Sequence, residues 1–170
     1  MIEISNTSNI PLPNNTQAYL DFSLHITGKI LHKIITRPVE VVFVSSQTIQ
    51  QLNAQYMHKD YATDVLSFPL DMNINVQNID SKQQPLIPLG SIVINLDLAQ
   101  TMSQKLNHSL IQEIMLLFVH ALLHLLGFDH ERDNGQHHIL EQQILYELNM
   151  QDKNTTQENI AKGLIERNQK

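Results

Sequence analysis

Hydrophobic residues recur at two spacings along the chain, and the change between them separates predicted strands from predicted helices. Continuous or alternating apolar runs predict strands at residues 2–4, 39–44, 64–70 and 89–95. The run at 39–44 is mostly β-branched, which is typical of a strand buried on both faces. Because strands and helical patterns alternate along the chain, we expect a mixed sheet.

Apolar residues at helical spacing predict helices between and after these strands. The first covers residues 14–35, and the second follows a serine cap and covers residues 46–56. The third begins after Ser109, which forms a capping-box pattern with Gln112. A last helix is predicted from about residue 136 to about residue 148.

Length and composition are those of one folded domain. The chain has 170 residues, of which 42% are hydrophobic and 16% charged. The predicted fold class is α/β (mixed α+β), with a small mixed sheet of about four strands packed against about five helices. We expect one domain at residues 1–150, in which 71–88 form a surface loop, followed by a polar tail at 151–170.

Charge and cysteine content narrow the possible chemistry. Lysine and arginine number 11 and aspartate and glutamate 17, so the net charge is 11 − 17 = −6. Any RNA contact must therefore rely on a local basic patch, for which Lys59, Arg132 and Lys105 are the candidates. The absence of cysteine excludes disulfides, thiolate nucleophiles and thiolate metal ligands, which leaves His, Asp and Glu as ligands.

The termini and the longest apolar run predict a cytoplasmic protein without a membrane partner. The first residues lack the basic and apolar regions of a secretory signal. The apolar run at 114–128 contains two histidines and is shorter than the ~20 residues that span a bilayer. We therefore interpret this run as a buried helix.

Two histidines inside that apolar helix are the strongest chemical signal. His120 and His124 are four residues apart, so they project from one helical face and can bind one metal ion. Gly127 can end the helix near residue 126 and turn the chain so that His130 approaches the same face. Three imidazoles favour zinc and leave one coordination position open for catalysis.

A structural metal site is the alternative, and it requires a fourth protein ligand. Asp129, Asp133 and His137 are the nearest candidates for that ligand. Asp129 is also expected to accept a hydrogen bond from a metal-bound histidine, whereas His137 and His138 are expected to face solvent at the start of the last helix.

The histidine spacing also occurs in metzincin proteases, in which a glutamate directly follows the first histidine and acts as the general base. Ala121 occupies that position here. A peptidase is therefore excluded as the favoured function.

The segment from His120 to His130, HALLHLLGFDH, resembles the H-G-x-L-H-L-x-G-[YF]-D-H signature of the YbeY endoribonuclease family. Upstream, residues 52–69 resemble the second sequence block of that family, and residues 89–94 resemble its third block. The blocks follow the family order and span most of residues 50–130.

The resemblance implies an α/β fold in which His120, His124 and His130 bind one zinc ion per chain beside a cleft. It also implies a cytoplasmic endoribonuclease that cuts single-stranded RNA, including ribosomal RNA, and contributes to ribosomal RNA maturation and ribosome quality control. The expected partner is the ribosome or its small subunit. The candidate catalytic residues are His124, Lys59, Asp64 and Ser67, and the candidate substrate-binding residues are Lys59 and Arg132.

Three positions differ from the family pattern. Ala121 replaces a glycine, Met57 an arginine, and Ser91 an acidic residue. Because a thioether cannot replace the planar guanidinium fork at a phosphate, the alternative function is a ribosome-associated binding protein with a structural zinc site and weak or no nuclease activity. A zinc hydrolase of small substrates is a third hypothesis, which rests on the ligand set alone.

Overall fold

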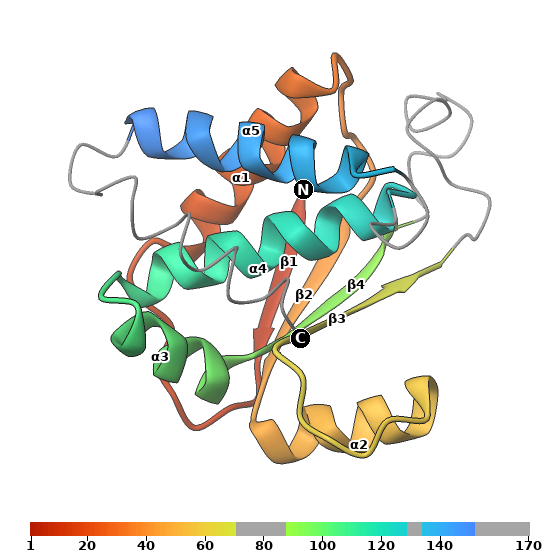
Figure 1. Ribbon diagram of the computed structural model, residues 1–170, viewed down its shortest axis with the longest axis vertical. Helices are drawn as coiled ribbons and strands as arrows, with labels where there is room; N and C mark the ends of the chain where they lie inside the picture. The colour runs from red at the N-terminus through yellow and green to blue at the C-terminus, as the bar shows by residue number, and fades with distance from the viewer. Residues whose placement is uncertain (71–87, 129–133, 152–170) are drawn as a thin grey trace.

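The computed structural model describes residues 1–70, 88–128 and 134–151, which form a four-stranded sheet and five helices (Figure 1). The strands are β1 (Ile2–Asn6), β2 (Val39–Val44), β3 (Val65–Pro69) and β4 (Gly90–Asn95). The helices are α1 (Thr16–Ile30), α2 (Ser46–Met57), α3 (Leu96–Lys105), α4 (Leu110–Leu125) and α5 (Gln136–Gln151). The predicted fold class is therefore confirmed.

The sheet has the strand order β1-β2-β4-β3. β1 pairs with β2 and β2 with β4 in parallel, whereas β3 pairs with β4 in the antiparallel direction. Gly90 opens β4 and lies opposite Val39 of β2 on one side and Pro69 of β3 on the other. The sheet is thus mixed, as predicted, with β3 as its antiparallel edge.

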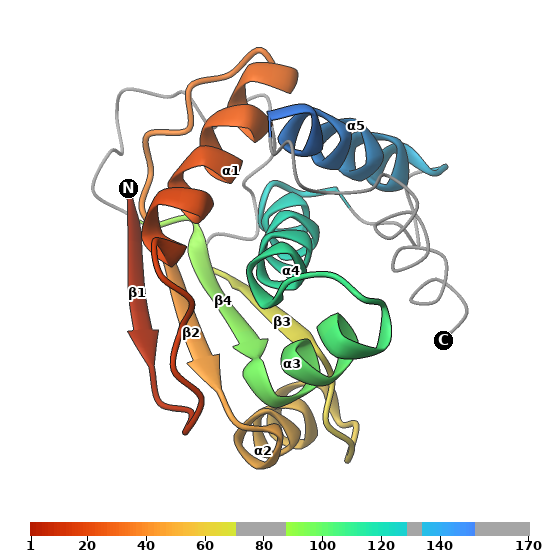
Figure 2. The same ribbon diagram turned by 90° about the vertical axis from the view of Figure 1, so that its left-hand side faces the viewer.

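Helices cover the two faces of the sheet unequally. The main hydrophobic core joins one face of the sheet to α1, α4 and α5, which pack against one another (Figure 2). Val44, Leu66 and Val93 face the other way and pack with Ile49 of α2 in a smaller cluster. Most of the apolar burial therefore lies around α4, which stabilises its position against the sheet.

Both ends of α4 are defined by hydrogen bonds that the sequence predicts. The main-chain N–H of Ser109 donates to Oε1 of the Gln112 side chain at 2.8 Å. In return, the main-chain N–H of Gln112 donates to the Ser109 hydroxyl oxygen at 3.4 Å. At the other end Gly127 adopts a φ of 88°, and its amide donates to the His124 carbonyl oxygen at 3.0 Å. A glycine in this conformation satisfies the last carbonyl groups of the helix and directs the chain away from it.

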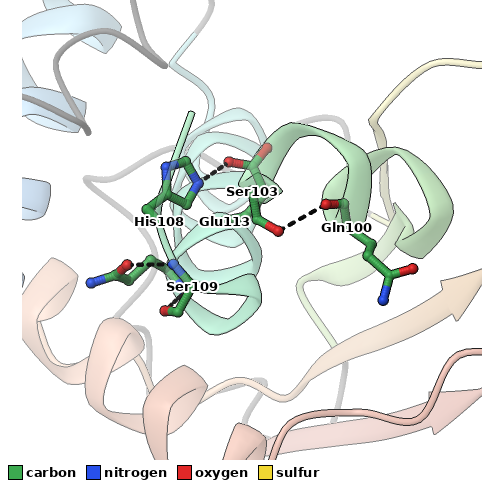
Figure 3. A network of polar contacts seen from close by, with 6 residues as sticks. Gln100, Ser103, His108, Ser109 and Glu113 are labelled. Carbon is green, nitrogen blue, oxygen red and sulfur yellow. Dashed lines mark hydrogen bonds and ion pairs between the residues drawn. The ribbon is translucent and has the colours of Figure 1, made fainter. Parts of the chain in front are cut away.

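A buried polar pair fixes the connection between α3 and α4. Nε2 of His108 donates to Oε2 of Glu113 at 2.8 Å, and the two side chains are 2% and 1% exposed (Figure 3). In the preceding helix the hydroxyl of Ser103 donates to the Gln100 carbonyl oxygen at 2.9 Å. Because the pair links the loop to the first turn of α4, it holds the start of that helix in place.

Two helices differ from the sequence prediction. α1 ends at Ile30 instead of residue 35, because His32 adopts a φ of 53° and the amide of Lys33 donates to the Gly28 carbonyl oxygen at 2.9 Å. The sequence reading missed α3, which begins directly after β4 with Asn95 as its cap. The predicted loop at 71–88, apart from Pro88, and the tail beyond residue 151 lie outside the described residues, so the proposed domain limits stay predictions.

Within the described ranges, no single helix has both the length and the apolar composition needed to cross a membrane. α3 and α4 meet those two criteria only as a pair, and the pair is bent by 119°.

Candidate metal centre

The C-terminal half of α4 presents two histidine side chains side by side. The ring centroids of His120 and His124 are 4.9 Å apart, and both residues are half-buried. Their neighbours Leu122, Leu123 and Leu125 are buried in the core. The helix therefore places both imidazoles at the margin of the core, as the spacing of four residues predicts.

α5 adds a third imidazole to this pair. The ring of His137 lies 4.8 Å from that of His120 and 4.6 Å from that of His124, measured between centroids. One ligand atom from each of the three side chains lies within 4.8 Å of the others, so the cluster could hold a metal ion. His137 is 1% exposed, and the prediction that it faces solvent was wrong.

The correction has a physical cause in the packing of α5. Within residues 136–148 of this helix, the buried residues are His137, Glu141, Ile144, Leu145 and Leu148. They follow one another at helical spacing and form a single stripe that packs against α1 and α4 (Figure 2). His138 is next in sequence but lies off that stripe, and its side chain is 41% exposed. The stripe was the sequence signal that could have shown that His137 is buried.

The carboxylate of Glu141 on α5 lies within hydrogen-bond distance of the His120 ring. Its Oε1 lies 2.9 Å from Nδ1 of His120, and its side chain is 4% exposed. A carboxylate accepts this hydrogen bond, so Nδ1 carries the proton and Nε2 keeps the lone pair that a metal requires. The sequence reading assigned this function to Asp129, which lies outside the described residues.

The remaining candidate residues fall into two groups. His130 and Arg132 lie outside the described residues, as does Asp133. Lys59 is exposed just after α2, and Ser67 is half-buried on β3 opposite Ile92, whose side chain belongs to the core on the α4 face of the sheet.

Asp64 and the positions that differ from the family pattern have defined surroundings. The carboxylate of Asp64 accepts a hydrogen bond from the Val65 amide at 2.9 Å, so part of its hydrogen-bonding capacity serves the local turn. Met57 is 40% exposed at the end of α2. Ser91 donates to the carboxylate of Glu40 on β2, so an acidic group lies beside this position although residue 91 itself is not acidic.

The donor set fits a transition-metal ion. Imidazole suits zinc, copper, iron and nickel, and a ring whose second nitrogen is held by a carboxylate is the usual state of a metal-bound histidine. His120 meets that condition, and the half-buried or buried location of all three rings limits competition from solvent. The cluster can therefore bind a metal ion, the property that the sequence predicts for His120 and His124.

Comparisons with known proteins bear on the same region. A family model described as "Endoribonuclease YbeY" matches residues 3–149. A protein named "Endoribonuclease YbeY" from Campylobacter jejuni (strain RM1221) is 47% identical over 114 residues, which cover 67% of this chain and 77% of the relative. One of the same name from Helicobacter pylori (strain ATCC 700392 / 26695) is 43% identical over 142 residues, 83% of this chain and 92% of the relative.

A solved structure supports the fold. The solution structure of TM1509 from Thermotoga maritima aligns with a TM-score of 0.56 and 22% identity, covering 87% of this chain and 89% of that one. The family model spans the sheet, α4 and most of α5, including all three clustered histidines. By its sequence, the chain belongs to the YbeY endoribonuclease family.

Proposed function

We propose that this protein is a metal-dependent endoribonuclease that cuts single-stranded RNA. The histidine cluster at the end of α4 carries the proposal, because it lies within a chain that matches the endoribonuclease family over residues 3–149. The relative from Campylobacter jejuni, which is named an endoribonuclease, is 47% identical over 114 residues, or 67% of this chain.

The metal we propose is zinc, one ion per chain. His120, His124 and His130 are the proposed ligands, with His130 taken from the sequence resemblance. When bound, such an ion polarises a phosphoryl oxygen or lowers the pKa of a bound water to about 7. Glu141 contributes by fixing the orientation of the His120 ring.

The chain supplies further groups that suit an RNA substrate. Lys59 is exposed and offers an ammonium group as a point charge for a phosphate. Ser67 offers a hydroxyl on the edge strand β3, and Asp64 offers a carboxylate oxygen where that strand begins. We propose Lys59 and Arg132 as substrate-binding residues, and Lys59, Asp64 and Ser67 as catalytic residues together with His124.

The proposed cellular function is ribosomal RNA maturation and ribosome quality control in the cytoplasm. It follows from the family resemblance, and its partner is the ribosome or its small subunit.

A second candidate function has one observation in its favour. His137 is buried beside both His120 and His124. A fourth nitrogen ligand from this residue would fill the coordination position that a substrate or water needs. A closed site is structural, and Met57 lacks the phosphate-binding fork of an arginine. The alternative is therefore a ribosome-associated binding protein with a structural metal and weak or no nuclease activity.

The deciding experiment is cleavage of an end-labelled, unstructured RNA by the full chain and its His124→Ala variant, resolved on a gel. We expect internal cuts with the unaltered protein and none with the variant, which should also retain less metal by elemental analysis. His25→Ala is the matched control, because His25 is exposed on α1. Cutting that survives in His124→Ala contradicts the proposal, and binding without cutting by the metal-loaded protein supports the alternative.

A further inference from the structure

Large apolar side chains are exposed together at the end of α2 and in the segment that follows it. Tyr56 is 55% exposed, Met57 40% and Tyr61 54%. In the described part of the chain, the only other aromatic residue that is exposed is Tyr146 on α5. Because aromatic rings usually carry much of a domain's buried area, two exposed tyrosines close together indicate a contact surface.

Hydrogen bonds hold the segment after α2 against that helix. His58 ends α2 with a φ of 58°, and the chain then runs back beside the helix before it enters β3 (Figure 1). The side-chain amide of Asn53, a residue that is 2% exposed, donates to the Tyr61 carbonyl oxygen at 2.8 Å. The amide of Lys59 donates to the main-chain oxygen of Asn53 at 3.3 Å. Because Asn53 lies one helical turn before Tyr56, Tyr61 is anchored close to Tyr56.

The ring of Tyr56 is supported from β3. Its centroid lies 5.3 Å from that of Phe68, and the two rings meet edge to face at an interplanar angle of 70°. Phe68 in turn packs against the buried cluster between the sheet and α2. A tyrosine has only two side-chain torsions, so a ring that is supported in this way loses little conformational freedom when a ligand stacks on it.

The charge of this surface indicates how it can bind RNA. Residues 56–61 contain one lysine, Lys59, and one aspartate, Asp60, so their formal charge is 1 − 1 = 0. The carboxylate of Asp60 accepts a hydrogen bond from the Gln50 side chain at 2.9 Å, whereas Lys59 is exposed. A neutral surface does not attract RNA by charge alone. Stacking on an aromatic ring needs no net charge, because every base has a π-face.

We propose that Tyr56 and Tyr61 are base-stacking residues for single-stranded RNA, and that Lys59 pairs with a phosphate beside the stacked bases. The bases of a duplex already stack on one another, so this surface selects unpaired strands. It also gives the chain an RNA contact that does not need the guanidinium fork missing at Met57. The inference rests on the proposed function only in taking RNA as the substrate.

The first test measures affinity of the full chain for a short, unstructured, fluorescently labelled RNA by anisotropy. Its riboses carry 2′-O-methyl groups, and a gel checks that it stays intact. We expect Tyr61→Ala and Tyr56→Ala each to weaken binding by about 5–150-fold, the usual effect of removing one stacking ring. Tyr61→Phe keeps the ring and should bind as the unaltered protein does.

Tyr146→Ala is the matched control, because Tyr146 is 53% exposed but lies on α5. It should bind RNA as the unaltered protein does. Circular dichroism checks that each variant is folded, and Tyr61→Ala decides the question if loss of the contact with Phe68 unfolds Tyr56→Ala. The proposal is overturned if Tyr61→Ala binds as tightly as Tyr61→Phe, if Tyr146→Ala loses as much affinity, or if a duplex of the same sequence binds as tightly as the single strand.

A second measurement uses the emission of the tyrosines themselves. The chain has four tyrosines and no tryptophan, so its intrinsic fluorescence comes from tyrosine. A base stacked on a tyrosine ring quenches that emission. We expect RNA to quench the unaltered protein but not the double variant Tyr56→Phe/Tyr61→Phe, which keeps both rings and still binds. Equal quenching in the double variant overturns the proposal.

The outcomes also separate this inference from the proposed function. Stacking on both rings in a protein that cuts no RNA leaves the inference intact and refutes the nuclease. RNA cutting whose kcat/KM is the same in Tyr61→Ala and the unaltered protein refutes the stacking and leaves the nuclease intact.

Discussion

Among the three glycines whose surroundings the structure describes, Gly90 is the one at which an added methyl group would make the shortest contact. It adopts a φ of 156°, and a Cβ added there would lie 2.3 Å from the Phe68 carbonyl oxygen and 2.9 Å from Cδ2 of Leu125. Leu125 follows the metal-site residue His124 on α4. The methyl group added in Gly90→Ala therefore pushes β4 away from the edge strand β3 on one side and from the end of α4, which carries the site, on the other.

The cost has two sources. A residue in a sparsely populated backbone region costs about 1–3 kcal/mol, and overpacking a filled site costs about 1–3 kcal/mol more. The Phe68 oxygen is main chain in the β3–β4 ladder, so it cannot move aside as a flexible side chain could. We therefore expect Gly90→Ala to lower the free energy of unfolding by about 2–6 kcal/mol.

Gly135→Ala is the matched control. Gly135 also has a positive φ, 88°, but no described atom lies within 4 Å of the position that a Cβ would take. The left-handed conformation alone costs about 1–2 kcal/mol for a residue with a side chain. Urea unfolding of both variants, followed by circular dichroism, measures the difference. If Gly90→Ala is no more destabilising than Gly135→Ala, the steric argument is refuted.

Two further predictions concern the buried polar pair of His108 and Glu113 and the position that lacks the family arginine. Replacing Glu113 by leucine removes the acceptor of buried His108, and we expect urea unfolding to show a free energy of unfolding that is lower by about 1–3 kcal/mol. Glu113→Gln should lower it less, because the amide oxygen still accepts. Equal losses in the two variants would contradict this. Met57→Arg should tighten binding of unstructured RNA by about tenfold or more and steepen its salt dependence, because a guanidinium pairs with phosphate. Met57→Leu should bind as the unaltered protein does, and an arginine variant that also does so would exclude a phosphate near this residue.

The strands and the central helix were predictable because their signals are local. The capping box of Ser109 and Gln112 and the stop at Gly127 act within one or two helical turns. α3 also has a local signal, an asparagine cap at Asn95 with Asp97 in the first turn, but it follows β4 without an intervening loop. The apolar pattern of the strand and that of the helix merge there, which obscured the boundary.

The candidate site was only half predictable. His120 and His124 are paired by helical geometry alone, so their spacing identifies them. His137 and Glu141 meet that pair through the packing of α5 on α4, a tertiary contact across 17 and 21 positions of the chain. The stripe shared with Ile144 shows that these polar residues face inward, but it does not show which helix they meet.

The strand order has a consequence for how the chain folds during synthesis. β2 is complete early, yet one of its two neighbours is β4, whose residue Ser91 pairs with Glu40 across 51 positions. At a translation rate of about 5–20 residues per second, that partner is synthesised about 3–10 s later. Until then β2 has an unpaired apolar edge, and parallel pairing across such a separation is intrinsically slow. The nascent chain therefore passes through a period in which the unpaired edge of β2 can pair with other chains, and α4 can pack on the complete sheet only after that period ends.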